Sequence, residues 1–215
     1  RHDAREIGNF CRENGILFAL DAIQGLGAVE VDVQAWKVDF LASGGQKWLL
    51  SPMGSGFIYV SPGLLPALRV SYPGWLSVKD AWNFFDYRLD YLPTAERFEP
   101  GTKPVLPLRG MLAAVRLLRS VPDAERERRI LDLSGYLIRE LKQRGIRVIT
   151  PEDGAHRAGI VTFEAPGDAE KIHQELKEAG VDLSFRSGML RASPHFYNTE
   201  DDLNRLLSRL EKHLA

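Results

Sequence analysis

The sequence has little cysteine, no long hydrophobic run and no excess of charge of either sign. Cys11 is the one cysteine among 215 residues, so no internal disulfide can form and a reducing compartment, the cytoplasm, is expected. No apolar run approaches the roughly 18 residues that span a bilayer, and no export signal is recognisable. We therefore expect no membrane partner. Lys and Arg number 28 against 29 Asp and Glu, and without a basic excess we expect no nucleic-acid partner.

The remaining composition is typical of a globular protein. Hydrophobic residues make up 44% of the chain and charged residues 27%, which is enough apolar material to bury a core. The first residue is Arg1 rather than Met, and residues 1–14 already have the pattern of a helix inside a domain. We therefore interpret the chain as a fragment.

The hydrophobic pattern of the first part predicts an α/β fold. Apolar residues at helical spacing predict a helix over residues 1–14, and short apolar runs predict strands over residues 16–20, 38–42 and 57–60. Strands that are apolar on both faces are typical of a mostly parallel sheet covered by helices. Residues 61–104 contain six prolines and many aromatic residues. They predict a long loop that covers a site or a subunit contact.

The last part of the chain reads as a small α+β unit. Helical spacing predicts helices over residues 105–119, from 123 to about 144, and over 168–179, and Asp123 is the expected cap of the second of these. A capping box at residues 199–202 predicts a fourth helix after it. Apolar runs predict strands over residues 146–149, 159–163, 181–185 and 189–192.

Two residues that follow predicted strands could carry chemistry. Asp21 ends the first apolar run, and ligands bind at the carboxyl ends of strands in open α/β sheets. An equally good interpretation is that Asp21 only caps the turn after it. Lys47 follows the second run, among serine, glycine and glutamine. A lone lysine is usually a solvated surface charge, whereas a lysine in a partly buried cleft can form a Schiff base with a carbonyl.

Two further segments could bind anions. Gly101 and Thr102 precede a predicted helix, where backbone N–H groups and a hydroxyl favour a phosphate; a plain helix cap is the alternative. Arg191 lies on a predicted strand, from which a guanidinium can clamp a carboxylate, although a surface ion pair is the commoner fate of an arginine. The five histidines show no spacing typical of ligands, so no metal site is expected.

These segments together resemble the class V aminotransferases, a family of fold-type I pyridoxal-phosphate (PLP) enzymes that includes the cysteine desulfurases. The resemblance rests on four motifs in the family's order: Asp21-Ala-Ile-Gln24, Gln46-Lys47 with Pro52-Met-Gly-Ser-Gly56, Arg97-Phe-Glu-Pro-Gly-Thr102, and Leu190-Arg191-Ala-Ser-Pro-His-Phe-Tyr-Asn-Thr199. It implies that residues 1–110 are the C-terminal part of a large PLP-binding domain with the aromatic loop 61–104. Residues 111–215 would be a linking helix and a small α+β domain.

The resemblance also implies a role for each residue. Lys47 would be the Schiff-base lysine and proton shuttle, and Asp21 would pair with the protonated pyridine nitrogen, which keeps the ring an electron sink. Gln24 would hydrogen-bond the phenolic oxygen. The phosphate would lie near Ser43 and Gln46, with Thr102 contributed across a homodimer interface. Arg191 would bind the α-carboxylate of a small amino-acid substrate.

Three departures from the family pattern leave the reaction open. Many desulfurases have His where this chain has Gln46, and the serine often found three residues before the lysine is replaced by Gly44. No cysteine lies between Val181 and Arg191, which disfavours persulfide chemistry by the usual route. We expect an aminotransferase, with a C–S lyase or desulfurase-like enzyme as one alternative. A truncated homologue without activity, which keeps the fold for dimerisation, is the other.

Overall fold

The computed structural model describes residues 1–214, and they form two compact units. One unit comprises Asp3–Gly27 and Val31–Ser120, and the other comprises Val121 onwards together with Arg1–His2 and Ala28–Glu30. We refer to them as the N-terminal and C-terminal units and describe each by itself. No helix of residues 1–214 is both long and apolar enough to cross a membrane.

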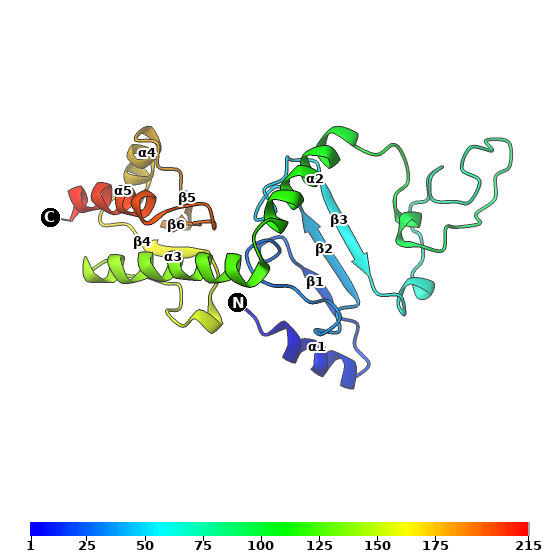
Figure 1. Ribbon diagram of the computed structural model, residues 1–215, viewed down its shortest axis with the longest axis horizontal. Helices are drawn as coiled ribbons and strands as arrows, with labels where there is room; N and C mark the ends of the chain where they lie inside the picture. Colours follow the sequence, from blue (N-terminus) through cyan, green and yellow to red (C-terminus); the bar gives the residue numbers. More distant parts are fainter. Residues whose placement is uncertain (215) are drawn as a thin grey trace. The chain divides into compact units, whose positions relative to one another are not determined.

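The N-terminal unit is built on a three-stranded sheet in the order β1-β2-β3 (Figure 1). The strands are β1 (Ala19–Asp21), β2 (Phe40–Gly44) and β3 (Gly56–Val60). Strands β1 and β2 are parallel, with Asp21 opposite Ala42, whereas β2 and β3 are antiparallel, with Gly44 opposite Gly56. The predicted α/β class is confirmed, and the parallel arrangement holds for β1 and β2 but not for β3.

The direction of β3 follows from the length of its connection. Residues 45–55 join β2 to β3 without a helix, and a parallel return requires a crossover of about a dozen residues or more, usually helical. Strand β1 is also shorter than predicted. Ile16 and Leu17 are 49% and 64% exposed, and the Phe18 backbone N–H is bonded by the Asp39 carboxylate rather than by a strand partner.

Helix α1 (Ala4–Glu13) and the long loop complete this unit. A small core of Phe18, Ala22, Val38 and Leu41 lies beneath the sheet, with partly buried side chains of α1 packed against it. Residues 61–104 contain only short 3-10 turns, at Leu65–Ala67 and Ala95–Phe98, and one isolated bridge between Val78 and Tyr91. Helix α2 (Val105–Arg119) then follows, over the predicted residues.

The C-terminal unit has a second, fully antiparallel sheet covered by helices. Its strands, in the order β4-β6-β5, are β4 (Val161–Glu164), β6 (Met189–Ala192) and β5 (Ser184–Arg186). The helices are α3 (Asp123–Gln143), α4 (Ala169–Glu178) and α5 (Glu200–Leu210). Phe163 and Leu190 of the sheet are fully buried against leucines and isoleucines of all three helices, in one large core.

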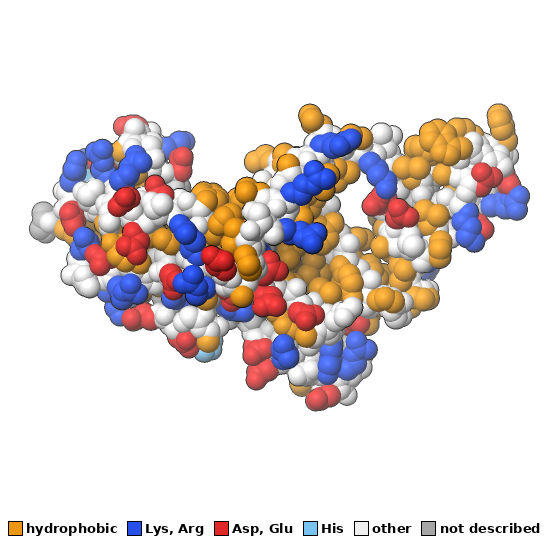
Figure 2. All heavy atoms as spheres, viewed as in Figure 1, with side chains coloured by type: hydrophobic (Ala, Val, Ile, Leu, Met, Phe, Trp, Pro, Cys, Tyr) orange, Lys and Arg blue, Asp and Glu red, His pale blue; other side chains and the backbone are white. Residues whose placement is uncertain are grey.

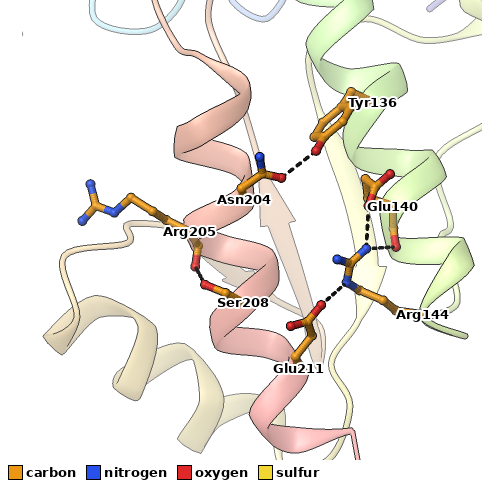
Figure 3. A network of polar contacts seen from close by, with 7 residues as sticks. All are labelled: Tyr136, Glu140, Arg144, Asn204, Arg205, Ser208 and Glu211. Carbon is orange, nitrogen blue, oxygen red and sulfur yellow. Dashed lines mark hydrogen bonds and ion pairs between the residues drawn. The ribbon is translucent and has the colours of Figure 1, made fainter.

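Polar contacts along the rim of this core hold α5 against α3 (Figure 3). The Tyr136 hydroxyl donates to Asn204 Oδ1 at 2.6 Å. Arg144, just past the end of α3, donates to Glu140 at 2.6 Å and to Glu211 Oε1 at 2.8 Å. Its hydrogen bond with Glu140 raises the Arg144 pKa, so the guanidinium stays charged. These side chains lie on the helix faces that are left outside the core.

The capping box predicted for α5 is confirmed, and two other local predictions were wrong. Thr199 Oγ1 accepts from the Asp202 backbone and the Asp202 carboxylate from the Thr199 backbone. Helix α3 is capped by Pro122 without a side-chain bond, because the Asp123 carboxylate pairs with Arg126 inside the first turn. Residues 146–149 form no strand. They lie along β4 through a single bridge, from Val148 to Phe163, and backbone hydrogen bonds such as that from the Ile149 N–H to the Thr162 carbonyl at 2.9 Å.

Candidate active site at the edge of the first sheet

The parallel pairing of β1 and β2 brings their carboxyl ends to the same edge of the sheet. Asp21 is the last residue of β1 and Gly44 the last of β2, and the Ala22 backbone N–H donates to the Ala42 carbonyl at 2.9 Å. Lys47 follows three residues after Gly44. The segments that carry Asp21 and Lys47 therefore leave the sheet side by side (Figure 1).

Trp48 joins these two segments. Its indole Nε1 donates to the Gln24 side-chain oxygen at 3.3 Å. Its carbonyl lies against Gly27, where an added Cβ would come within 2.2 Å of the Trp48 oxygen, and Gly27 has a φ of +97°. Only glycine combines that conformation with so close an approach. Sequence analysis missed Trp48 and Gly27 as parts of the site.

The Asp21 carboxylate has two functions open to it. Its Oδ1 accepts from the Ile23 backbone N–H at 3.0 Å, so the turn-capping interpretation describes a bond that is present. The side chain is nevertheless exposed, and an ionised carboxylate has acceptor capacity for more than one donor. Capping therefore leaves Asp21 able to bind a cationic group.

Lys47 and Gln46 lie on the exposed side of the turn after β2. The Lys47 side chain makes no hydrogen bond or ion pair with any other residue of the described range 1–214. The Gln46 side chain folds back over Gly44, where an added Cβ would lie 2.5 Å from its Oε1. Ser43 differs from both: it is buried in β2, and its hydroxyl donates to the Gly44 carbonyl at 3.2 Å.

Thr102 lies three residues before α2. It is exposed, and the first turn of the helix has no side-chain cap because Pro104 occupies the cap position. The neighbouring Lys103 pairs with Glu99 at 2.7 Å, and this bond raises the Lys103 pKa. The backbone N–H groups at the start of α2 are thus free of side-chain caps and near a hydroxyl.

Arg191 occupies the central strand of the C-terminal unit. Its neighbours Leu190 and Ala192 point into the core, so by alternation Arg191 lies on the opposite face, beside Thr162 and Ser184. Its Nε is buried and has no hydrogen-bond partner among residues 1–214. A buried guanidinium N–H without an acceptor is costly, which makes this face suited to an anionic ligand.

Arg97 shares this property and was missed as a candidate site residue. It lies on the 3-10 turn Ala95–Phe98, and its Nε is likewise buried without an acceptor in the described part of the chain. The two adjacent carboxylates are bound elsewhere, Glu96 to Thr94 and Glu99 to Lys103. The signal in the sequence was the motif that begins at Arg97, four residues before Gly101.

The aromatic loop carries its own cluster. The ring centroids of Trp75 and Trp82 are 5.1 Å apart, and Phe84 lies 6.1 Å from each. The loop encloses an open hollow of about 480 Å³ lined by residues between 73 and 90. Figure 2 shows hydrophobic side chains gathered over this segment, and Phe85 and Tyr87 are more than 90% exposed.

Within residues 1–214, no group of three or more His, Cys, Asp or Glu side chains is arranged to hold a metal ion. The chemistry of the sheet edge is that of a primary amine, a carboxylate and an amide.

Comparisons with known proteins agree on one family. The family model for class V aminotransferases matches residues 1–206. An uncharacterized aminotransferase of Bacillus subtilis is 26% identical over 208 residues, which are 97% of this chain and 54% of that protein. The chain spans about half the length of the curated relatives it matches.

Solved structures extend the likeness to the fold. The apo cysteine desulfurase of Thermococcus onnurineus NA1 has a TM-score of 0.89 and 25% identity, over 99% of this chain and 56% of that one. The cystine C–S lyase C-DES, in a mutant with glycine covalently linked to its PLP cofactor, has a TM-score of 0.85 and 27% identity, over 97% of this chain and 56% of that one.

Proposed function

Because the chain belongs to the class V aminotransferase family, we propose that it is part of a PLP-dependent enzyme that transfers the amino group of a small amino acid. The family is PLP-dependent, and one of its solved members carries the cofactor. The proposal is supported by the course of the segments that follow β1 and β2, which carry Asp21 and Lys47 and leave the first sheet at the same edge. A carboxylate and a primary amine there can flank one ring.

The residues at this edge fit the cofactor. The Lys47 amine is exposed and has no partner within residues 1–214, as an amine that condenses with an aldehyde requires. Asp21 has acceptor capacity left for a protonated ring nitrogen. Gln24 accepts from Trp48 through its oxygen, which leaves its amide N–H groups to donate to a phenolic oxygen.

When bound, PLP supplies an electron sink for the negative charge that develops at the substrate Cα. Lys47 anchors the cofactor and moves a proton at Cα. Asp21 keeps the ring nitrogen protonated. Gln46 binds the phosphate, and Ser43 supports this region from within β2. Thr102 is contributed across the interface of a homodimer.

Arg191 binds the α-carboxylate of the substrate in this proposal. The support is its buried Nε without an acceptor, on the face of the C-terminal sheet that lies away from the core. A substrate carboxylate supplies the missing acceptor, in a bidentate geometry that lysine does not reproduce.

A C–S lyase reaction is the second candidate, and the turn between β5 and β6 limits which thiol such a reaction could use. Strands β5 and β6 are joined by a two-residue turn, Ser187 and Gly188, because Arg186 pairs directly with Met189. Both turn residues have positive φ, as tight hairpin turns require. The turn has no room for a loop that carries a nucleophilic cysteine. Any cleavage of a C–S bond would therefore use no thiol from this connection.

We propose that the protein works in the cytoplasm as a homodimer. Cys11 is a free, half-buried thiol, in keeping with a reducing compartment. The exposed aromatic residues of the loop give a second subunit a surface to cover. A protein that keeps only the fold for dimerisation would share this surface but not the reactive lysine.

The test is the variant Lys47→Ala in the full-length protein, with Lys37→Ala as the control because Lys37 is an exposed lysine of the same unit. We expect the wild type and the control to form a yellow adduct with PLP. Borohydride reduction followed by peptide mass spectrometry places the adduct on Lys47. Unchanged visible absorbance in Lys47→Ala would refute the assignment.

Two further outcomes separate the alternatives. Absence of any reducible adduct in the wild type would favour the homologue without activity. With the adduct present, amino transfer to a 2-oxo acid supports the aminotransferase. Release of sulfide from cysteine supports the lyase.

A further inference from the structure

The turn that carries Lys47 is closed by backbone hydrogen bonds between its two ends. The Gly45 N–H donates to the Ser55 carbonyl at 2.9 Å, and the Ser51 N–H donates to the Gly45 carbonyl at 2.8 Å. Inside the turn, the Leu50 N–H donates to the Lys47 carbonyl at 3.0 Å. Residues 45–55 thus form a closed loop rather than an open connection.

Two buried hydroxyl groups lie at the point of closure. Ser51 and Ser55 are 7% and 6% exposed, and their Oγ atoms are 2.6 Å apart. Ser55 Oγ donates to the Pro52 carbonyl at 2.8 Å. A hydroxyl has one hydrogen to donate, so Ser51 must donate to Ser55. The order of donation is therefore Ser51 to Ser55 to the Pro52 carbonyl.

This pair fits tightly against Gly45. A Cβ added at Gly45 would lie 2.7 Å from Ser51 Cβ and 2.8 Å from Ser55 Oγ. The hydroxyl pair therefore rests on the backbone two residues before Lys47. Because the Lys47 side chain has no partner of its own in residues 1–214, this backbone sets the point from which the side chain reaches out.

We propose that Ser51 and Ser55 are positioning residues for Lys47. The inference rests on the proposed function, because it concerns the amine to which that function assigns the cofactor. A held turn keeps the Lys47 backbone at one place, which removes the part of the entropy cost that comes from ordering the backbone in each turnover. Neither hydroxyl needs to touch cofactor or substrate to have this effect.

The variants Ser51→Ala and Ser55→Ala test the proposal, with Ser134→Ala as the matched control. Ser134 is also a buried serine with a hydrogen-bonded hydroxyl, but it lies on α3 in the other unit. In cofactor-free protein, we expect amide hydrogen exchange at residues 45–51 to rise about tenfold in both variants, the factor that corresponds to one lost buried hydrogen bond. The control should leave these residues unchanged.

A second measurement separates positioning from a general loss of stability. With PLP bound, we expect release of the cofactor from Lys47 to become about tenfold faster in both alanine variants. The pH midpoint of the adduct absorbance should also move. The melting temperature of these variants should be no lower than that of Ser134→Ala. Ser51→Thr keeps the hydroxyl and should restore both. If Ser51→Ala does not fold, the same measurements on Ser55→Ala test the proposal.

The proposal is overturned if both alanine variants keep the exchange, the release rate and the pH midpoint of the wild type. Failure of the proposed function has a different signature, because the wild type then forms no adduct. The exchange measurement on cofactor-free protein would still show whether the hydroxyl pair holds the turn.

Discussion

A buried guanidinium N–H without a hydrogen-bond acceptor points to a ligand. The free-energy cost of leaving it unpaired is removed when a ligand supplies the acceptor. Leaving one buried charged donor without a partner costs about 1–3 kcal/mol or more. Arg97 and Arg191 both have a buried Nε in this state, within the residues that the structure describes. Arg191 lies on the central strand β6, where its backbone pairs with Thr162 and Ser184.

The first prediction concerns Arg191. Arg191→Ala should raise KM for amino-acid substrates about a hundredfold, since loss of a charged hydrogen-bonded contact costs about 2–5 kcal/mol. PLP should remain bound. Steady-state kinetics and cofactor titration measure the two effects, with Arg147→Ala as the control because Arg147 forms an exposed ion pair with Glu164. Loss of the cofactor with an unchanged KM would contradict the role.

The second prediction separates two glycines that share a positive φ. Gly27 has a φ of +97° and no room for a Cβ, whereas Gly15 has a φ of +65° and nothing within 4 Å. Gly15→Ala should cost about 1 kcal/mol of unfolding free energy, from backbone strain alone. Gly27→Ala should cost about 3 kcal/mol or more, because the clash with the Trp48 carbonyl is added. Urea unfolding measures both, and equal losses would refute the close approach.

At the scale of single elements, a sequence signal predicted the local structure well where the whole interaction lies within a few residues and no other partner competes for it. The capping box of α5 joins residues three apart, so the sequence contains the whole interaction. The cap of α3 failed because Asp123 has a competing partner in Arg126. The predicted strand 146–149 failed for a different reason. A strand depends on a neighbour, and the neighbour β4 offers this segment only one bridge.

The third prediction concerns the pH dependence of that capping box. The hydrogen bond from the Thr199 backbone lowers the Asp202 pKa below its ordinary value of 3.8. A carboxyl whose folded pKa is lowered stabilises the fold above the unfolded pKa and loses this contribution as the pH falls through the folded pKa. Asp202→Asn should therefore be less stable than the wild type at pH 7, and this difference in stability should shrink as the pH falls below 3.8 and through the lowered pKa of the folded state.

Thermal unfolding at a series of pH values from 7 downwards measures the difference in stability between Asp202→Asn and the wild type. Asp201→Asn is the control, because Asp201 is an acidic residue of the same first turn that lies outside the box. A gap of the same size at every pH would show that the carboxylate does not act through its charge.

At the scale of the whole molecule, the sequence predicted the strands that precede the candidate residues but not how the turns after them close. Two apolar runs that each end near a reactive residue are enough to place Asp21 and Lys47 at one edge, once the strands are parallel. The serine pair behind Lys47 and the contact of Trp48 with Gly27 depend on the path of residues 45–55 in space. No periodicity or spacing contains that path, so these residues could not be predicted.

The two units bury their apolar surface to very different degrees. In the C-terminal unit, one core extends from the sheet through α3, α4 and α5, and Leu137 and Leu141 are fully buried. In the N-terminal unit, the core is a small cluster around Phe18 and Leu41, and Phe57 and Ile58 of β3 remain 40% exposed. A sheet of this class is normally covered on both faces. Phe57 and Ile58 are consecutive and point to opposite faces, so both faces of β3 leave apolar surface exposed.

The last prediction follows from this difference. Residues 121–215 alone should fold cooperatively, with a urea m-value of about 1 kcal/mol/M, as expected for a small domain, and should bind little of a dye that reports exposed apolar surface. Residues 3–120 alone should bind the dye strongly and unfold over a broad range of urea, because their sheet is uncovered.

Two variants serve as controls for these pieces. Leu137→Ala should abolish the cooperative transition of residues 121–215, since truncation at a fully buried leucine costs about 2–5 kcal/mol. Leu112→Ala, at a 43% exposed position of α2, should change the second piece little. A sharp transition and weak dye binding in residues 3–120 would show that the small core is sufficient by itself.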